Sequence, residues 1–265
     1  MSAEAIHTRI WREEAEPDNP FAARVAYCRG YDVFGQMVGN ARWVEMLTLL
    51  FRDELPSASS LDMLEALAVA LANPGPRDPS VHAAMSGGVG GSTAAASLIA
   101  ALAVGAGSYK GGREVFDAMN AWTACRDDFA DWATCLTRHV QETVDIWPQR
   151  EHPPGFDPHG VSTPTSVRQL LETLAGIGAS PRLTWLAAQR QEQEKTVGLP
   201  LDISGIAAAA FADLGFTPAE GEMLYLLLRL PGAAAHAIEQ AGYGYKRFPF
   251  NQVELEDDPA SKASP

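Results

Sequence analysis

Residues 199–240 read LPLDISGIAAAAFADLGFTPAEGEMLYLLLRLPGAAAHAIEQ, and most of this stretch has helical character. Its apolar residues predict helices over 206–214 and 218–240. Asp202 stands just before the first helical run, where an aspartate is a common N-cap. Arg229 stands inside the apolar run LLLRLPG, where an unpaired charge would be costly, so we expect a ligand or a protein partner for it.

The rest of the chain repeats this helical spacing. In residues 41–56, Val44, Leu47, Leu50 and Phe51 fall at helical intervals, and the pattern ends at Pro56. Further helices are predicted over 59–73, 92–105, 114–122, 129–145, 166–174 and 181–195. Val, Ile and Thr do not alternate with polar residues over any convincing window. The pattern therefore predicts an all-α protein of roughly ten helices joined by Pro/Gly-rich turns.

Length and composition indicate a globular chain. The 265 residues suffice for one large domain or two small ones, and 46% of them are apolar. No run of about 18 uninterrupted apolar residues occurs, so we expect no membrane span. The N-terminal residues are charged and lack the apolar core of a secretory signal, which favours a cytoplasmic protein.

Charge and metal-ligand spacing exclude two classes of function. The formal net charge of -13 argues against general nucleic-acid binding, although a local group of arginines could still bind a small anion. Three cysteines, Cys28, Cys125 and Cys135, show no metal spacing and are expected to be free thiols. The six histidines show no metal spacing either, so we predict no metal site.

The glycine-containing stretch GSYKGGREVF, residues 107–116, suggests a phosphate-binding loop at first sight. It fails both nucleotide patterns, because Lys110 precedes the two glycines and no predicted strand leads into the segment. A tight turn between helices, which Gly111 and Gly112 would allow, is the simpler structural alternative.

Two blocks of sequence resemble the citrate synthase superfamily, and in particular its short members, the citryl-CoA lyases and the citryl-CoA-cleaving module of ATP-citrate lyase. The first block, AYCRGYDVFGQMVGNARWVEMLTLLFRDELPS, matches at Tyr27, Arg29, Gly30, Tyr31, Asp32, Glu45, Leu49, Leu50, Leu55 and Pro56. The second lies within residues 199–240 and matches at Asp202, Ser204, Gly205, Leu214, Gly215, Arg229, Gly232, Ala235, His236, Glu239 and Gln240. The resemblance covers most of residues 27–247.

The resemblance implies a mostly α-helical homodimer. Residues 1–113 and 212–265 would form a large helical domain, and residues 114–211 a smaller inserted helical domain that closes as a lid. Closure of such a lid excludes water from the site. The implied reaction joins acetyl-CoA to the ketone of oxaloacetate or splits citryl-CoA. A CoA thioester is then a substrate, and neither a metal nor a redox cofactor is needed.

The resemblance also implies roles for particular residues. Asp202 would exchange a proton with the acetyl methyl carbon. His159 would exchange a proton with the ketone or hydroxyl oxygen. Lys110 stands where citrate synthases carry their first catalytic histidine, and it could stabilise the enolate, bind a CoA phosphate or only sit at the turn. Three arginines would hold substrate carboxylates: Arg168, Arg229 and Arg247, the last from the neighbouring subunit.

Each of these residues also has a simpler interpretation that involves neither catalysis nor substrate binding. Asp202 could be only an N-cap, His159 a solvated loop histidine, and each arginine a member of an ion pair. His236, two turns beyond Arg229, is expected to be a core or interface histidine.

The sequence departs from the family pattern at several positions. Asn73 and Pro74 replace an Asp-His pair, for which the nearby His82 could compensate in binding substrate. One extra residue separates Gly155 from His159. Three hypotheses therefore stay open: a citryl-CoA lyase or citrate synthase-type enzyme, a related enzyme with another oxo acid or acyl-CoA, and a non-catalytic protein with the same dimeric scaffold.

Overall fold

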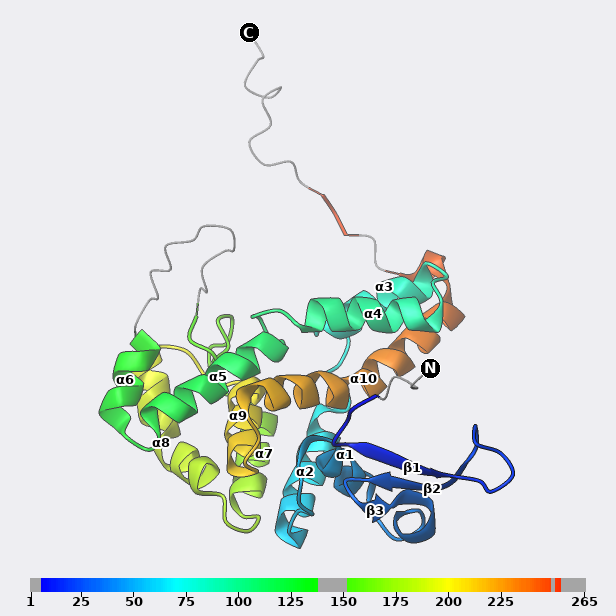
Figure 1. Cartoon of the computed structure of the whole chain (residues 1–265). Helices are drawn as coiled ribbons and strands as arrows, with labels where there is room; N and C mark the ends of the chain where they lie inside the picture. The colour runs from blue at the N-terminus through cyan, green and yellow to red at the C-terminus, as the bar shows by residue number, and fades with distance from the viewer. Residues whose placement is uncertain (1–5, 138–151, 249–250, 254–265) are drawn as a thin grey trace.

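The structure is a computed structural model that describes residues 6–137, 152–248 and 251–253 (Figure 1). It is mostly helical, which confirms the predicted fold class. The helices are α1 (Trp43–Phe51), α2 (Ala58–Leu71), α3 (Pro79–Val89), α4 (Ala94–Gly105), α5 (Gly112–Cys125), α6 (Phe129–Thr137), α7 (Thr165–Ala175), α8 (Pro181–Val197), α9 (Ile203–Asp213) and α10 (Pro218–Tyr243). The predicted helix over 129–145 is α6, and its part beyond residue 137 lies outside the described residues.

The long helix α10 begins at a capping box in which Thr217 accepts from the backbone N–H of Glu220 and the Glu220 side chain accepts from that of Thr217. It continues through Pro231, as the apolar pattern predicted. The next residue, Gly232, donates its N–H to the carbonyl of Ala72 at 2.7 Å, outside the helix. A Cβ at this glycine would lie 2.6 Å from the same oxygen, so a side chain here would prevent the close contact between α10 and the end of α2.

Helix α3 was not predicted from the sequence. Its start carries a recognisable signal, because Asp78 accepts from the N–H of Ser80 at 3.0 Å and Pro79 occupies the first helical position. Gly87 and Gly88 weaken the helical pattern further along. Packing against α10 requires a glycine at position 88, because a Cβ there would lie 2.1 Å from the carbonyl oxygen of Ala237.

The all-α prediction contained no strands, and this part of it is wrong near the N-terminus. The described part of the chain contains an antiparallel sheet of order β1-β2-β3, formed by β1 (Trp11–Ala15), β2 (Ala23–Cys28) and β3 (Tyr31–Asp32). Strand β1 reads WREEA, so charged residues hide the alternation that identifies a strand. The sheet packs beside α1 through Cys28, Met37 and Leu49, at some distance from α5 and α9 (Figure 1).

Helix α9 lies at the centre of the main hydrophobic core. All its residues from Ile206 to Phe211 are fully buried, and it contacts α2, α5, α7, α8 and α10. Close to it, Trp122, Trp132 and Trp185 pack edge-to-face or tilted at ring distances of 4.6–5.8 Å. This rigid packing fixes the start of α9, where Asp202 stands. The division into a large domain and a lid over residues 114–211 stays a prediction.

Candidate active site

Asp202 occupies the N-cap position of α9, but its carboxylate makes no capping hydrogen bond to the helix in the part of the chain that the structure describes. The side chain is buried, with the residue 7% exposed, and its Oδ2 accepts from the hydroxyl of Ser204 at 3.3 Å. Burial raises the pKa of Asp202, and the neighbouring Glu114 carboxylate raises it further, while Lys110 and the backbone N–H of Ile203 partly oppose both effects. The carboxyl group is therefore suited to proton transfer rather than to capping.

Lys110, on the turn between α4 and α5, lies within electrostatic range of Asp202. It has a left-handed backbone with φ of 53°, an uncommon conformation for a residue other than glycine. Its Nζ donates to Oδ2 of Asp157 at 3.2 Å. Burial lowers the pKa of Lys110, but the charges of Asp202 and Asp157 outweigh burial and raise the pKa above its ordinary value. The side chain is a permanent cation at neutral pH.

Glu114 joins the three segments that carry these groups. It is 1% exposed, near the start of α5. Its Oε2 accepts from the backbone N–H of Lys110 at 2.6 Å, and its Oε1 accepts from the N–H of Gly155 at 3.0 Å and from the hydroxyl of Ser204 at 3.1 Å. The sequence analysis missed this residue, because a glutamate in the first turn of a helix is ordinarily a favourable surface charge.

A second close contact brings the loop after residue 152 against the start of α9. Gly155 has φ of +91°, and its carbonyl accepts from the N–H of Asp202 at 2.9 Å. A Cβ on Gly155 would lie 2.8 Å from the Cα of Gly205. Both positions therefore require glycine if the loop is to approach Asp202 this closely.

The same loop carries Asp157 and His159. Burial alone would raise the pKa of Asp157, but the N–H of His159, at 3.0 Å, and the Lys110 ammonium outweigh it and lower the pKa. Asp157 is thus an ionised partner for Lys110. The imidazole of His159 is exposed and packs edge-to-face on Tyr109 at a ring distance of 5.6 Å.

His152, which the sequence analysis did not select, is the histidine buried against the carboxylates. Its Nε2 lies 3.5 Å from Oε1 of Glu114 and has no hydrogen-bond partner among the described residues. Its ring packs edge-to-face on Tyr109 at 6.3 Å, so Tyr109 contacts both histidines. Its place in a proline-rich loop gave no signal of burial.

Arg229 has the partner that its apolar surroundings predicted. The residue is 5% exposed and forms an ion pair through Nη2 with Oδ2 of the buried Asp78. Its Nη1 donates to the carbonyl of Lys110 at 2.7 Å, and its guanidinium lies 4.7 Å from the ring centre of Tyr225. The Asp78–Arg229 pair is therefore bonded to the backbone of the turn that carries Lys110.

Burial raises the pKa of the Tyr225 phenol. Arg229 lowers it, and Asp202, Glu114 and Asp78 raise it. The three carboxylates and Arg229 thus form one electrostatic group around this tyrosine.

The structure does not bring the remaining predicted binding residues into this group. Arg168 lines a separate cavity of about 480 Å³, whose wall includes Pro200, and the carbonyl of Pro200 accepts from the N–H of Asp157 at 2.9 Å. Its Nη2 donates to Thr165 at 3.0 Å, and it has no acidic partner within residues 6–137 and 152–248. Arg247 is exposed beyond the end of α10, in the short helix η2 (Tyr245–Arg247). His82 is exposed on α3 and packs on Phe248 at 5.6 Å.

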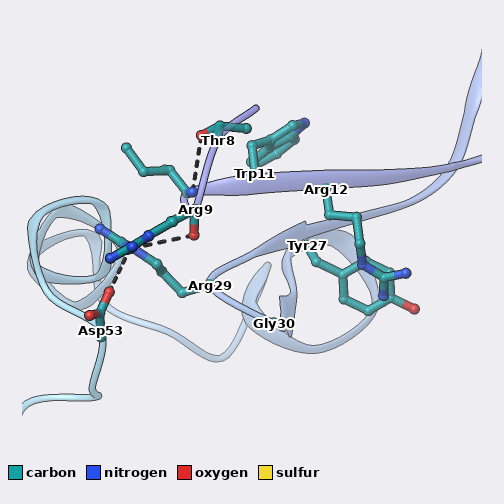
Figure 2. Close-up of a pocket in the computed structure, with 9 residues that line it drawn as sticks. Thr8, Arg9, Trp11, Arg12, Tyr27, Arg29, Gly30 and Asp53 are labelled. Atoms are coloured by element: carbon teal, nitrogen blue, oxygen red, sulfur yellow. Dashed lines mark hydrogen bonds and ion pairs between the residues drawn. The ribbon is translucent and has the colours of Figure 1, made fainter. Parts of the chain in front are cut away.

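Another cavity, of about 390 Å³, lies beside the N-terminal sheet (Figure 2). Arg29, one of the residues carrying the family resemblance, points across it to Asp53 and donates to the carbonyl of Arg9. Arg12 stacks on Tyr27 at 4.2 Å. None of the groups around Asp202 lines this cavity, and its arginine contacts hold the sheet to the end of α1.

The described residues contain neither a metal-ligand cluster nor a membrane-spanning helix. No group of three or more His, Cys, Asp or Glu side chains is arranged to hold a metal ion there. No helix in residues 6–137, 152–248 or 251–253 is both long enough and apolar enough to span a bilayer.

The raised pKa of Asp202 predicts a pH-dependent penalty on stability. The folded protein binds the Asp202 proton more tightly than the unfolded chain does, so protonation of Asp202 stabilises the fold. This stabilisation is complete below the ordinary pKa of 3.8 and is lost as the pH rises through the higher pKa of the folded state. We expect Asp202→Asn to unfold at a higher urea concentration than the unaltered protein at pH 7, with the difference shrinking towards pH 4. Urea titrations at both pH values measure this, and a stability difference that grew on acidification would contradict it.

Comparison with known proteins identifies the fold. No protein-family model matches the sequence, and no curated protein sequence does either. The structure matches citryl-CoA lyase from Hydrogenobacter thermophilus with a TM-score of 0.68 and 20% identity, covering 98% of this chain and 100% of that one. It matches ATP citrate lyase from Methanothrix soehngenii, in complex with citrate and coenzyme A, with a TM-score of 0.70 and 17% identity over 98% of this chain and 43% of that one.

Two further solved structures extend the match. An aspartate-to-alanine mutant of Methanosaeta concilii ATP citrate lyase, in complex with (3S)-citryl-CoA, has a TM-score of 0.70 at 15% identity and covers 98% of this chain and 44% of that one. Citrate synthase from Thermoplasma acidophilum, in complex with carboxymethyl coenzyme A and oxaloacetate, has a TM-score of 0.53 at 15% identity and covers 84% of this chain and 60% of that one. These matches confirm the predicted resemblance at the level of the fold, which is citrate synthase-like.

Proposed function

We propose that this chain, with its citrate synthase-like fold, is a carbon–carbon lyase or synthase that acts on a CoA thioester and a 2-oxo acid, with oxaloacetate as the reference compound. The observation that carries the proposal is the buried Asp202 carboxyl group, with its raised pKa, beside the Lys110 cation. Further support comes from the solved structures of the same fold, which hold coenzyme A, citryl-CoA, citrate or oxaloacetate.

The reaction needs a group that moves a proton at the acetyl carbon. In cleavage the carbon–carbon bond breaks, its electron pair passes to the acetyl thioester as an enolate, and Asp202 gives that carbon a proton. In synthesis Asp202 takes the proton from the methyl group. A pKa above the ordinary value favours both directions, because it brings the pKa of Asp202 closer to the working pH.

The enolate oxygen needs a positive charge or a hydrogen-bond donor. Lys110 supplies a cation a short distance from Asp202, and Asp157 orients its ammonium group at 3.2 Å. In a water-excluded site such a fixed charge stabilises a developing anion strongly. We assign Lys110 to the enolate.

The substrate hydroxyl must lose a proton in cleavage, and the ketone must gain one in synthesis. We assign this transfer to His159, because its backbone N–H bonds Asp157 while its imidazole is exposed, packs on Tyr109 and is open to a ligand. His152 is buried against Glu114, and we assign it to holding the loop. Both reaction directions balance in protons and need no metal or redox cofactor.

The proposal includes a homodimer whose inserted helical segment, residues 114–211, closes over the site. Arg247 stands exposed beyond the end of α10, a position from which it could reach into a neighbouring subunit. Arg168, whose charge has no acidic partner among the residues described, would take a substrate carboxylate on closure. Closure would also exclude water from the enolate.

Product analysis tests the proposed function. Purified protein is mixed with citryl-CoA, and separately with acetyl-CoA plus oxaloacetate, and the thioesters are identified by mass spectrometry. Formation of acetyl-CoA and oxaloacetate, or of citryl-CoA, supports the proposal. Absence of turnover with a panel of 3-hydroxyacyl-CoA and oxo-acid substrates would reject it in favour of a non-catalytic role.

A substitution at Lys110 separates catalysis from a role in the turn. Its φ of 53° suits glycine, so in Lys110→Gly the relieved backbone offsets part of the loss of the ion pair with Asp157, and we expect the free energy of unfolding to fall by no more than about 1 kcal/mol. The same change removes the enolate cation, for which we expect turnover to fall by about 100- to 1,000-fold, as for loss of one oxyanion donor. Thermal melts and steady-state kinetics measure the two effects, and Lys110→Arg, which keeps the charge, should retain more turnover than Lys110→Gly. If the glycine variant kept full turnover, the lysine would be only a turn residue.

A further inference from the structure

The ion pair between Asp78 and Arg229 suggests which substrates the enzyme accepts. This inference rests on the proposed function. We propose that Asp78 is a specificity-determining residue, which restricts the enzyme to 3-hydroxyacyl-CoA thioesters with one free carboxylate in place of the two of citryl-CoA. The corresponding oxo-acid product then has a single carboxylate, as pyruvate does, rather than the two of oxaloacetate.

The geometry of the pair carries this inference. Asp78 is 8% exposed, and it is held in place because its Oδ1 accepts from the N–H of Ser80 at 3.0 Å and also from the Ser80 hydroxyl, while its Oδ2 bonds Arg229. A substrate carboxylate that bound Arg229 in place of Asp78 would leave Asp78 buried without its cation, and an unpaired buried charge is costly. The positive charge of Arg229 is thus already compensated within the protein.

The other permanent cation of the site is engaged as well. Lys110 bonds Asp157 and lies within electrostatic range of Asp202. Around the reacting position, four carboxyl groups face two permanent cations: Asp78, Glu114, Asp157 and Asp202 against Lys110 and Arg229. With Arg168 and the neighbouring subunit's Arg247, which the proposed function adds on closure, the cations only equal these four carboxyl groups in number. Each additional substrate carboxylate therefore makes the charge of the site more negative, where like charges repel more strongly than in water.

Two features still allow one polar or charged substrate group. Nε of Arg229 is buried and has no hydrogen-bond partner in the described structure, so it can donate to a neutral acceptor such as a carbonyl oxygen. Arg168, which lines the cavity of about 480 Å³, has no acidic partner among the described residues, and its guanidinium suits one carboxylate.

The chemistry of the proposed step is unchanged. The bond between C2 and C3 of the 3-hydroxyacyl thioester breaks, the hydroxyl at C3 becomes the carbonyl of a monocarboxylic oxo acid, and acetyl-CoA takes the proton from Asp202. Citramalyl-CoA and citryl-CoA are a matched pair for this question. Citramalyl-CoA yields pyruvate, and citryl-CoA yields oxaloacetate. The two thioesters differ in one substituent, which is a methyl group in citramalyl-CoA and a carboxymethyl group in citryl-CoA.

The test compares the unaltered protein with Asp78→Asn. Asparagine keeps the N-cap of α3 while it removes the charge, and Asp78→Ser provides a second cap-competent variant. The exposed Asp62, which pairs with Arg42 on the surface, gives a charge-matched control as Asp62→Asn. Thermal melts establish that each variant is folded.

We measure kcat/KM for citramalyl-CoA and citryl-CoA, and by calorimetry the Kd of pyruvate and of oxaloacetate. The unaltered protein should prefer the monocarboxylate member of each pair. Asp78→Asn should shift both ratios towards the dicarboxylate by about tenfold or more, as expected for removal of one charge a few ångströms away, whereas Asp62→Asn should leave the ratios unchanged.

The two readouts distinguish failure of this inference from failure of the proposed function. Turnover with a preference for citryl-CoA, or with ratios that a folded Asp78→Asn variant does not move, would overturn the specificity role and leave the lyase intact. A shift in the binding ratio without turnover of either thioester would support the role of Asp78 and reject the catalytic function. Loss of folding in both Asp78→Asn and Asp78→Ser would make Asp78 structural and overturn the inference.

Discussion

Asp202→Asn is expected to lower turnover of a CoA thioester by about 100- to 10,000-fold, the usual contribution of general acid–base catalysis. Asparagine has nearly the same shape and can still accept from Ser204, which contacts Asp202 at 3.3 Å, but it cannot carry the proton. Binding of the thioester should change little, because the carboxyl group acts on the reacting carbon and not on the CoA portion. The expected result is therefore a fall in kcat with a nearly constant Kd.

Two measurements check this prediction. Steady-state kinetics give kcat, and calorimetric titration with a CoA thioester gives Kd for the same preparation. Asp62→Asn, an exposed change of the same chemical kind, should leave both values unaltered. Unchanged turnover in Asp202→Asn would remove the assignment of this residue, and with it the proposed mechanism.

Glu114→Ala is expected to destabilise the fold and to impair turnover together. The substitution leaves the backbone N–H groups of Lys110 and Gly155 without their acceptor, while the Ser204 hydroxyl keeps only Asp202 as acceptor. Each unsatisfied buried donor costs about 1–3 kcal/mol, so we expect the free energy of unfolding to fall by about 2 kcal/mol or more. In the fraction that folds, the segments carrying Lys110 and Asp202 lose their common anchor. A displacement of about 1 Å can cost on the order of 100-fold in rate.

Glu114→Gln is the matched variant for this prediction. The amide keeps one acceptor oxygen and the size of the side chain, so it should fall between the unaltered protein and Glu114→Ala in urea denaturation and in kcat. Glu65→Ala removes a half-exposed glutamate that pairs with Arg42 and should cost less than about 1 kcal/mol. Equal stability of Glu114→Ala and Glu65→Ala would show that Glu114 does not anchor the three segments.

The helical part of the fold was predictable because local patterns agree with tertiary packing. Helices α2, α4 and α10 begin at hydroxyl caps and carry apolar residues at helical spacing. Helix α3 escaped prediction because its glycines, which the contact with α10 requires, weaken the local pattern. The N-terminal sheet escaped because the short, highly charged β1 obtains its structure from pairing with β2, and pairing is not visible in a local window.

The candidate site was predictable only where the sequence carries a motif. Lys110 and Asp202 were selected from their positions in family-like segments, and the structure brings them together. Glu114, His152 and Asp78 were not selected, because each stands in an unremarkable local context and acquires its role from segments distant in the chain. The roles of His159, Arg168, Arg247 and His82 stay predictions.

The sequence by itself determined the positions of most helices, the citrate synthase-like resemblance and the choice of Asp202 and Lys110 as separate candidate catalytic groups. These follow from periodicity, capping and residue spacing, which are properties of short segments. Only the tertiary structure decided which charges neutralise one another. Arg229 meets Asp78 across 151 residues of sequence, and Ser204 meets Glu114 across 90. Burial makes those encounters selective, because in a site of low dielectric every charge needs a partner at hydrogen-bonding distance, and folding alone determines which one is there.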